Sequence, residues 1–184
     1  MAVDIAASLY PIAVDVQLGD WIYQIPPLPA ARWIEAIADT DGGAIVPGLF
    51  EDADQTSVWR EFVWGRIEPD ELKQAWRNVV GVVCGRPWWE AARLVLSATS
   101  QENWAVIHGK LVQRGMDLMT CSIGGFCNVV HVMALEGCKD DQERSQYQFD
   151  LSLPPPEVSA EEAHQATDAA ADFLGAMQQF QQLS

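Results

Sequence analysis

A short junction rich in glycine, proline and tryptophan constrains the fold of this chain most strongly. It reads Gly85-Arg86-Pro87-Trp88-Trp89. Glycine adopts the left-handed conformation that ends a helix, and proline at the first helical position sacrifices no hydrogen bond. We therefore predict that one helix ends at Gly85 and that the next begins at Pro87. Because adjacent helical residues point about 100° apart, one indole ring should enter the core and the other should bridge to a neighbouring element.

Hydrophobic spacing around this junction predicts a mainly α fold, a compact multi-helix domain with an N-terminal β-hairpin. Apolar and polar residues alternate on both sides of Gly19-Asp20, which is typical of a hairpin turn. Further along, apolar residues recur every three or four positions, as they do on one face of a helix. The predicted helices span residues 30–39, 56–64, 68–85, 87–98, 99–115, 120–137 and 139–151.

For two of these helices the sequence also predicts which residues face the core or cap the first turn. In the 56–64 helix, Trp59, Phe62 and Val63 are expected to face the core. The 99–115 helix is expected to begin with a capping box, in which Thr99 and Glu102 satisfy each other's backbone N–H groups.

A proline-rich stretch divides the chain into a domain and a C-terminal helix. We assign residues 1–153 to the hairpin and helical domain, 154–158 to a stiff extended linker, and 159–184 to an amphipathic helix. That helix carries an apolar seam at spacings of three and four residues. Because an isolated helix is marginally stable in water, the seam needs a groove, either on its own domain or on a partner. The seam residues are Ala166, Ala170, Phe173, Met177 and Phe180.

Charge and cysteine usage argue against several classes of protein. The formal net charge is −15 at pH 7, which disfavours binding to nucleic acid or to an anionic membrane. No apolar run approaches the length of a membrane span, and the N-terminus lacks the basic region of a signal peptide. The four cysteines show no disulfide spacing, so we expect reduced thiols and a cytoplasmic protein.

Cysteine and histidine patterns suggest two kinds of chemistry, and neither is well supported. Cys127, His131 and Cys138 share one helix face near Cys121, but the closely spaced ligand pairs of zinc sites are absent. We expect these cysteines in the core, where free cysteine is common. A nucleophile pair of Cys84 or Cys121 with His108 or His131 lacks a third, orienting group.

The remaining polar motifs are expected to have structural roles. The acidic pairs Asp70-Glu71 and Asp140-Asp141 stand where helix N-termini favour negative charge. Gly124-Gly125 matches no phosphate-binding loop. Arg86 and Arg93 are expected to stack on an indole ring or to pair with Glu90 or Glu102. We therefore predict a protein that is not an enzyme and that uses no cofactor or metal.

The order of these parts resembles the tail assembly chaperones of long-tailed phages that infect actinobacteria. The resemblance covers roughly residues 12–156, and its most distinctive piece is the Gly85 to Ala91 junction. The other matching pieces are Tyr23 to Trp33, Gly65 to Leu72, His108 to Leu111 with Gly115, and Leu151 to Pro155.

The resemblance implies a function in virion assembly. Such chaperones bind the long helical tape measure protein and keep it soluble before tail tube subunits polymerise around it. It implies further partners in other copies of the chain and in a longer, frameshifted form, of which this chain would be the shorter version. It also implies a location in the host cytoplasm and absence from the mature virion. The alternative is a structural virion component, such as a head–tail connector or a minor tail protein.

Overall fold

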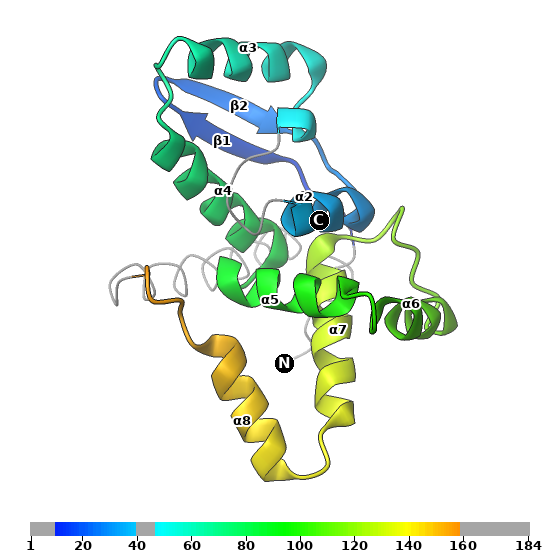
Figure 1. Cartoon of the computed structure of the whole chain (residues 1–184). Helices are drawn as coiled ribbons and strands as arrows, with labels where there is room; N and C mark the ends of the chain where they lie inside the picture. Colours follow the sequence, from blue (N-terminus) through cyan, green and yellow to red (C-terminus); the bar gives the residue numbers. More distant parts are fainter. Residues whose placement is uncertain (1–9, 40–46, 159–184) are drawn as a thin grey trace, which may run out of the picture.

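The protein is mainly helical and carries one antiparallel hairpin near its N-terminus (Figure 1). The computed structural model describes residues 10–39 and 47–158. The predicted fold class is confirmed over these residues. The C-terminal helix expected at 159–184, with its seam, lies outside the described residues.

The hairpin pairs strand β1 (Val14–Leu18) with strand β2 (Trp21–Ile25), so that Val16 lies opposite Tyr23. Gly19 adopts a positive φ of 58° in the turn, as the sequence predicts. Alternation places Val16, Leu18 and Tyr23 on the buried face of the sheet.

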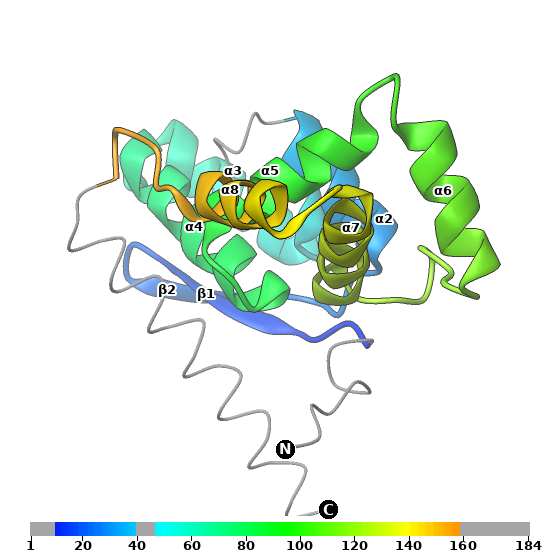
Figure 2. The same ribbon diagram turned by 90° about the horizontal axis from the view of Figure 1, so that it is seen from below.

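The helices form two groups, one at the hairpin and one at the opposite end of the molecule. In Figure 1, α3 runs beside β2 and α4 beside β1, whereas α7 and α8 diverge like the arms of a V with α5 across the open end. Figure 2 shows α6 on the far side of α7 from α8. The elements are α2 (Ala30–Asp39), the 3₁₀ helix η1 (Pro47–Leu49), α3 (Asp52–Val63), α4 (Pro69–Cys84), α5 (Trp88–Thr99), α6 (Trp104–Gln113), α7 (Ile123–Gly137) and α8 (Asp141–Ser152).

The junction between α4 and α5 has the predicted form, with one shift in register. Gly85 ends α4 in the left-handed conformation, with φ 62°. Pro87 is the cap before α5 and not its first helical residue. Trp89 is only 3% exposed, whereas the half-buried Trp88 lies under the guanidinium of Arg77 from α4, 4.5 Å from the ring centroid. One ring is therefore buried and the other bridges two helices, as expected.

Helix α3 differs from its prediction in extent and in orientation. It begins at Asp52, four residues earlier than expected, and Trp59 and Val63 are 47% and 76% exposed. The inward face carries Val58 and Glu61 instead. Glu61 tolerates burial because Arg66 reaches one of its carboxylate oxygens at 2.9 Å. Hydrophobic spacing misplaced this face because it treats a glutamate as solvent-facing.

Two helix starts also differ from expectation. Thr99 is the last residue of α5, and its hydroxyl donates to the carbonyl of Val95 at 2.9 Å, so it caps nothing that follows. The next helix, α6, begins only at Trp104 after a turn. Helix α7 starts three residues later than predicted, because the hydroxyl of Ser122 accepts a hydrogen bond from the N–H of Gly125 at 3.0 Å.

The core lies where α2, α4, α5 and α7 meet. Trp33 of α2 stacks on Trp76 of α4 with ring centroids 6.1 Å apart. Helix α7 approaches α4 closely at Gly124, where an added Cβ would lie 3.1 Å from the carbonyl oxygen of Val83. The glycine in α7 is therefore required by helix packing.

Replacing Gly124 with valine should lower the free energy of unfolding by about 1–3 kcal/mol, because the added carbons overpack the contact between α7 and α4. The control is Gly109→Val in α6, where a Cβ meets nothing within 4 Å. Its effect should stay within about 0.5 kcal/mol. Urea unfolding followed by tryptophan fluorescence measures both variants, and equal stabilities would contradict the close contact.

Candidate functional site: a groove between four helices

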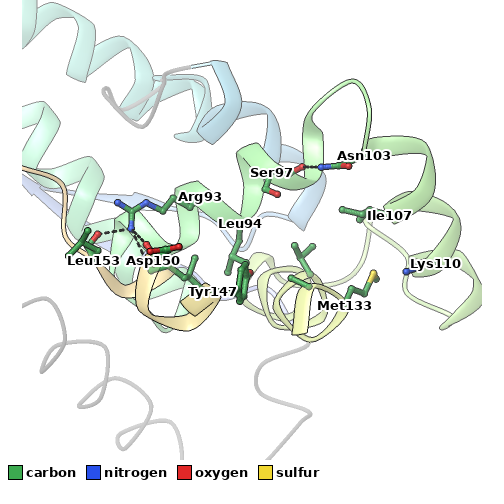
Figure 3. Close-up of a pocket in the computed structure, with 13 residues that line it drawn as sticks. Arg93, Leu94, Ser97, Asn103, Ile107, Lys110, Met133, Tyr147, Asp150 and Leu153 are labelled. Atoms are coloured by element: carbon green, nitrogen blue, oxygen red, sulfur yellow. Dashed lines mark hydrogen bonds between the residues drawn. The ribbon is translucent and has the colours of Figure 1, made fainter. Parts of the chain in front are cut away.

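An open groove with a volume of about 590 Å³ lies between α5, α6, α7 and α8 (Figure 3). We call it the α5–α8 groove. In Figure 3, Leu94, Ile107 and Met133 from three different helices lie around one space, with Tyr147 beside them. The lining residues are Arg93, Leu94, Ser97, Asn103, Ile107, Lys110, Val130, Met133, Ala134, Tyr147, Asp150, Leu151 and Leu153.

The wall formed by α8 is held in place by two side chains of α5. The guanidinium Nη1 of Arg93 lies 2.9, 2.8 and 2.6 Å from the carbonyl oxygens of Asp150, Leu151 and Leu153. One turn earlier, the indole N–H of Trp89 donates to the carbonyl of Ser152 at 3.2 Å. The last carbonyls of a helix have no partners within it and attract positive charge. Arg93 and Trp89 together therefore cap α8 and fix it to α5.

Arg86 extends this attachment to α7. Its guanidinium donates to the side-chain oxygen of Asn128 and lies 3.9 Å from the carboxylate of Glu90. The predicted pairing of Arg86 with Glu90 is thus confirmed. Burial raises the pKa of Glu90, and the charges of Arg86 and Arg93 partly offset that rise. The hydrogen bonds of Arg93 go to the end of α8, which a local sequence pattern cannot show.

Helices α7 and α8 contact each other through a pair of aromatic rings. His131 of α7 packs edge-on against Tyr147 of α8, with ring centroids 5.8 Å apart. Burial lowers the pKa of His131, and the positive charge of Arg86 lowers it further. The Nδ1 atom of His131 is buried without a hydrogen-bond partner. Both effects favour the neutral form of the ring, midway along α7.

The cysteine and histidine residues that suggested chemistry are engaged in packing. Cys84 and Cys127 are buried and hydrogen-bond to each other, and burial raises the pKa of the Cys84 thiol. A thiol of this kind is a poor nucleophile. His108 stacks on Trp104 instead of approaching a cysteine. In the part of the chain that the structure describes, no three His, Cys, Asp or Glu side chains are grouped for a metal ion.

A second group of exposed apolar side chains lies at the hairpin end of the molecule. Trp21 and Ile22 follow the hairpin turn, and Val63 and Trp64 end α3. The Arg66 guanidinium stacks on the Trp64 ring at 4.9 Å. These side chains form a surface separate from the α5–α8 groove.

The structure brings together only part of the predicted site. The junction residues Gly85, Trp88 and Trp89 lie where expected, Pro87 precedes α5 by one position, and Trp89 supports the groove. The predicted partner-binding residues, Ala166, Ala170, Phe173, Met177 and Phe180, lie outside the described residues. Sequence reasoning did not find the groove itself, because its walls come from four helices that only tertiary packing aligns.

The linker after α8 also shows more structure than three prolines suggest. The N–H of Val158 donates to the carbonyl of Pro155 at 2.9 Å, which closes a turn. Glu157 lies 3.5 Å from the guanidinium of Arg77 on α4. The described end of the chain therefore contains a turn and contacts α4 through Glu157.

Comparison with known proteins gives no assignment. No protein-family model, curated protein or solved structure matches this chain. None of the helices in residues 10–39 and 47–158 has the length and apolar character needed to cross a membrane. A function must therefore be inferred from the groove and the surfaces around it.

Replacing Arg93 with methionine should loosen α8, because three carbonyl oxygens lose their shared donor. We expect a loss of about 1–3 kcal/mol in the free energy of unfolding. Amide hydrogen exchange should also speed up in α8 more than in α3. The matched control is Arg144→Met, since Arg144 makes only an exposed ion pair with Asp141 within α8, worth at most about 1 kcal/mol. Unchanged exchange in α8 of the Arg93 variant would contradict the capping role.

Stability should fall below neutral pH, and His131 should account for part of the fall. Since its folded pKa is lower than the ordinary value of 6.5, the unfolded chain takes up a proton first as the pH drops. The contribution of His131 is therefore complete above pH 6.5 and is lost below it. Thermal unfolding at pH 7.5 and pH 5 should show a smaller drop in midpoint for His131→Leu than for the parent. Parallel pH curves for the two proteins would contradict a half-buried ring with a lowered pKa.

Proposed function

We propose that the protein is a phage tail assembly chaperone, which binds the tape measure protein and keeps it soluble until the tail tube polymerises. The observation that carries this proposal is the α5–α8 groove, open to solvent and lined mainly by apolar side chains. A groove of this kind accepts the apolar face of an amphipathic helix. The family that the sequence resembles acts on such a helix.

In the proposed mechanism, the groove reversibly covers apolar helix faces of the tape measure protein. Leu94, Ile107 and Met133 supply an apolar surface, and the rim carries Arg93 and Lys110 against a single acid, Asp150. An apolar centre with a charged rim is the usual arrangement of a protein interface. The net charge of −15 keeps the loaded complex in solution and opposes nonspecific association between copies.

The role is proposed to be that of a binding protein without catalysis, cofactor or metal. Its support is that the buried Cys84–Cys127 pair and the His131–Tyr147 contact already have packing roles. The proposed location is the host cytoplasm, and the protein is expected to leave before the virion matures. Other copies of the chain and a longer, frameshifted form are proposed as additional partners.

Co-expression tests the proposal directly. The chain is produced together with the tape measure protein encoded in the same genome, and the soluble fraction is analysed by size-exclusion chromatography with light scattering. A soluble complex with several copies of this chain is expected. A tape measure that stays insoluble while this chain elutes alone would contradict the proposal.

A structural virion component remains the second candidate, and the hairpin surface favours it. Trp21, Ile22, Val63 and Trp64 expose apolar area that a neighbouring subunit would cover in an assembled particle. Mass spectrometry of purified virions separates the two functions. A connector or minor tail protein is found in the particle at a fixed stoichiometry, whereas a chaperone is absent.

A single charge in the groove should weaken tape measure binding. Leu153 lines the groove and is 49% exposed, so Leu153→Glu should leave the fold intact. We expect the yield of soluble tape measure to drop at least about fivefold, the equivalent of 1 kcal/mol or more. The matched control is Val63→Glu on the exposed end of α3, which should bind normally. Equal loss with both variants would show that the groove is not the binding surface.

A further inference from the structure

We propose that the α5–α8 groove is occupied by this chain's own C-terminal segment, residues 159–184, until a tape measure helix displaces it. The inference rests on the proposed function for its displacing partner, and concerns how the same groove is regulated. Four observations carry it: the size of the groove, the spacing of the seam, the place where the described chain ends, and charge.

The groove and the seam correspond in size and spacing. A volume of about 590 Å³ lies within the range of sites that enclose a drug-sized ligand, which is the bulk of a few large side chains. Phe173, Met177 and Phe180 stand at positions i, i+4 and i+7. That spacing is the anchor pattern of a helix bound in a groove.

The segment starts beside the groove that it would fill. Leu153 belongs to the groove wall, and only residues 154–158 separate it from the segment. Within the linker, Glu157 contacts Arg77 on α4, outside the groove lining, which keeps the start of the segment close to the domain. As a helix, residues 159–180 would be about 33 Å long, whereas α8, which forms one wall of the groove, is roughly 18 Å long. The segment is therefore long enough to span the groove. Such a short tether gives the segment an effective concentration in the millimolar range.

The charges of the two surfaces are complementary. Residues 159–184 contain no lysine or arginine and four acids, namely Glu161, Glu162, Asp168 and Asp172. The groove lining contains two bases, Arg93 and Lys110, and one acid, Asp150. In a chain with a net charge of −15, a lining with a net positive charge favours this acidic segment.

Occupation by the segment regulates binding by competition. A tape measure helix reaches only the fraction of molecules whose groove is free, so its apparent affinity is reduced by that fraction. If the segment fills the groove in nine molecules of ten, the apparent dissociation constant is about tenfold weaker. The apolar groove is thereby covered in the free protein and opens for a helix that binds more strongly.

Photo-crosslinking of the full chain tests where the segment lies. Benzoylphenylalanine is introduced in place of Phe173, and in a control protein in place of Gln182, which lies about half a helical turn around from the seam. The dilute proteins are irradiated and digested, and the adducts are mapped by mass spectrometry. The Phe173 probe should attach to groove residues such as Ile107 and Met133 within one chain, at least fivefold more often than the Gln182 probe.

Three results would overturn the proposal: equal groove labelling by both probes, adducts at the hairpin end, or adducts that join two chains. The last would place the segment in the groove of a second copy. In the complex with co-expressed tape measure, groove adducts of the Phe173 probe should fall several-fold. Unchanged groove adducts in that complex would contradict displacement.

A seam variant separates this inference from the proposed function. The full chain with Phe173→Ser, Met177→Ser and Phe180→Ser should bind a synthetic tape measure peptide up to about tenfold more tightly than the parent. Unchanged or weaker binding would contradict competition by the segment. If the segment crosslinks to the groove but the tape measure stays insoluble, the proposed function is contradicted and this inference is not. If the tape measure binds but the segment does not crosslink to the groove, this inference is contradicted and the proposed function is not.

Discussion

The carbonyl oxygens at the end of α8 need hydrogen-bond donors, and α5 supplies them. Arg93 reaches three of these oxygens and Trp89 a fourth. Donors on a charged group are stronger than neutral ones, and they are most useful where helix carbonyls are otherwise unpaired. Helix α8 is highly polar and buries only Leu151 fully among its own residues. Its position, and with it one wall of the groove, therefore depends on this cap.

The junction between α4 and α5 also positions α7, which forms another wall of the groove. Arg86 joins the start of α5 to Asn128 of α7, and Gly124 lets α7 approach the carbonyl of Val83 at the end of α4. The contacts of Arg86, Trp89 and Arg93, together with the close approach at Gly124, fix α4, α5, α7 and α8 relative to one another. The His131–Tyr147 contact adds a direct link between α7 and α8.

Local signals in the sequence were sufficient for the hairpin, for α2 and for the end of α4, where Gly85 has one favourable conformation. They failed at Glu61, which hydrophobic spacing places in solvent although it is buried, with its carboxylate paired to Arg60 and Arg66. They also failed at Thr99. Its sequence motif matches a capping box, but its hydroxyl donates to the carbonyl of Val95 within α5. The groove could not be predicted either, since its shape depends on angles between four helices. The seam at Phe173, Met177 and Phe180 stays a prediction.

We propose that a helical partner binds the α5–α8 groove and not the hairpin end. The most direct measurement places a photo-crosslinking residue at Leu153 in one protein and at Trp64 in another, each co-expressed with the tape measure. Both positions are exposed and apolar, so they differ mainly in location. The account predicts tape measure adducts from position 153 and few from position 64. Adducts from position 64 alone would contradict it and move the binding surface to the hairpin end.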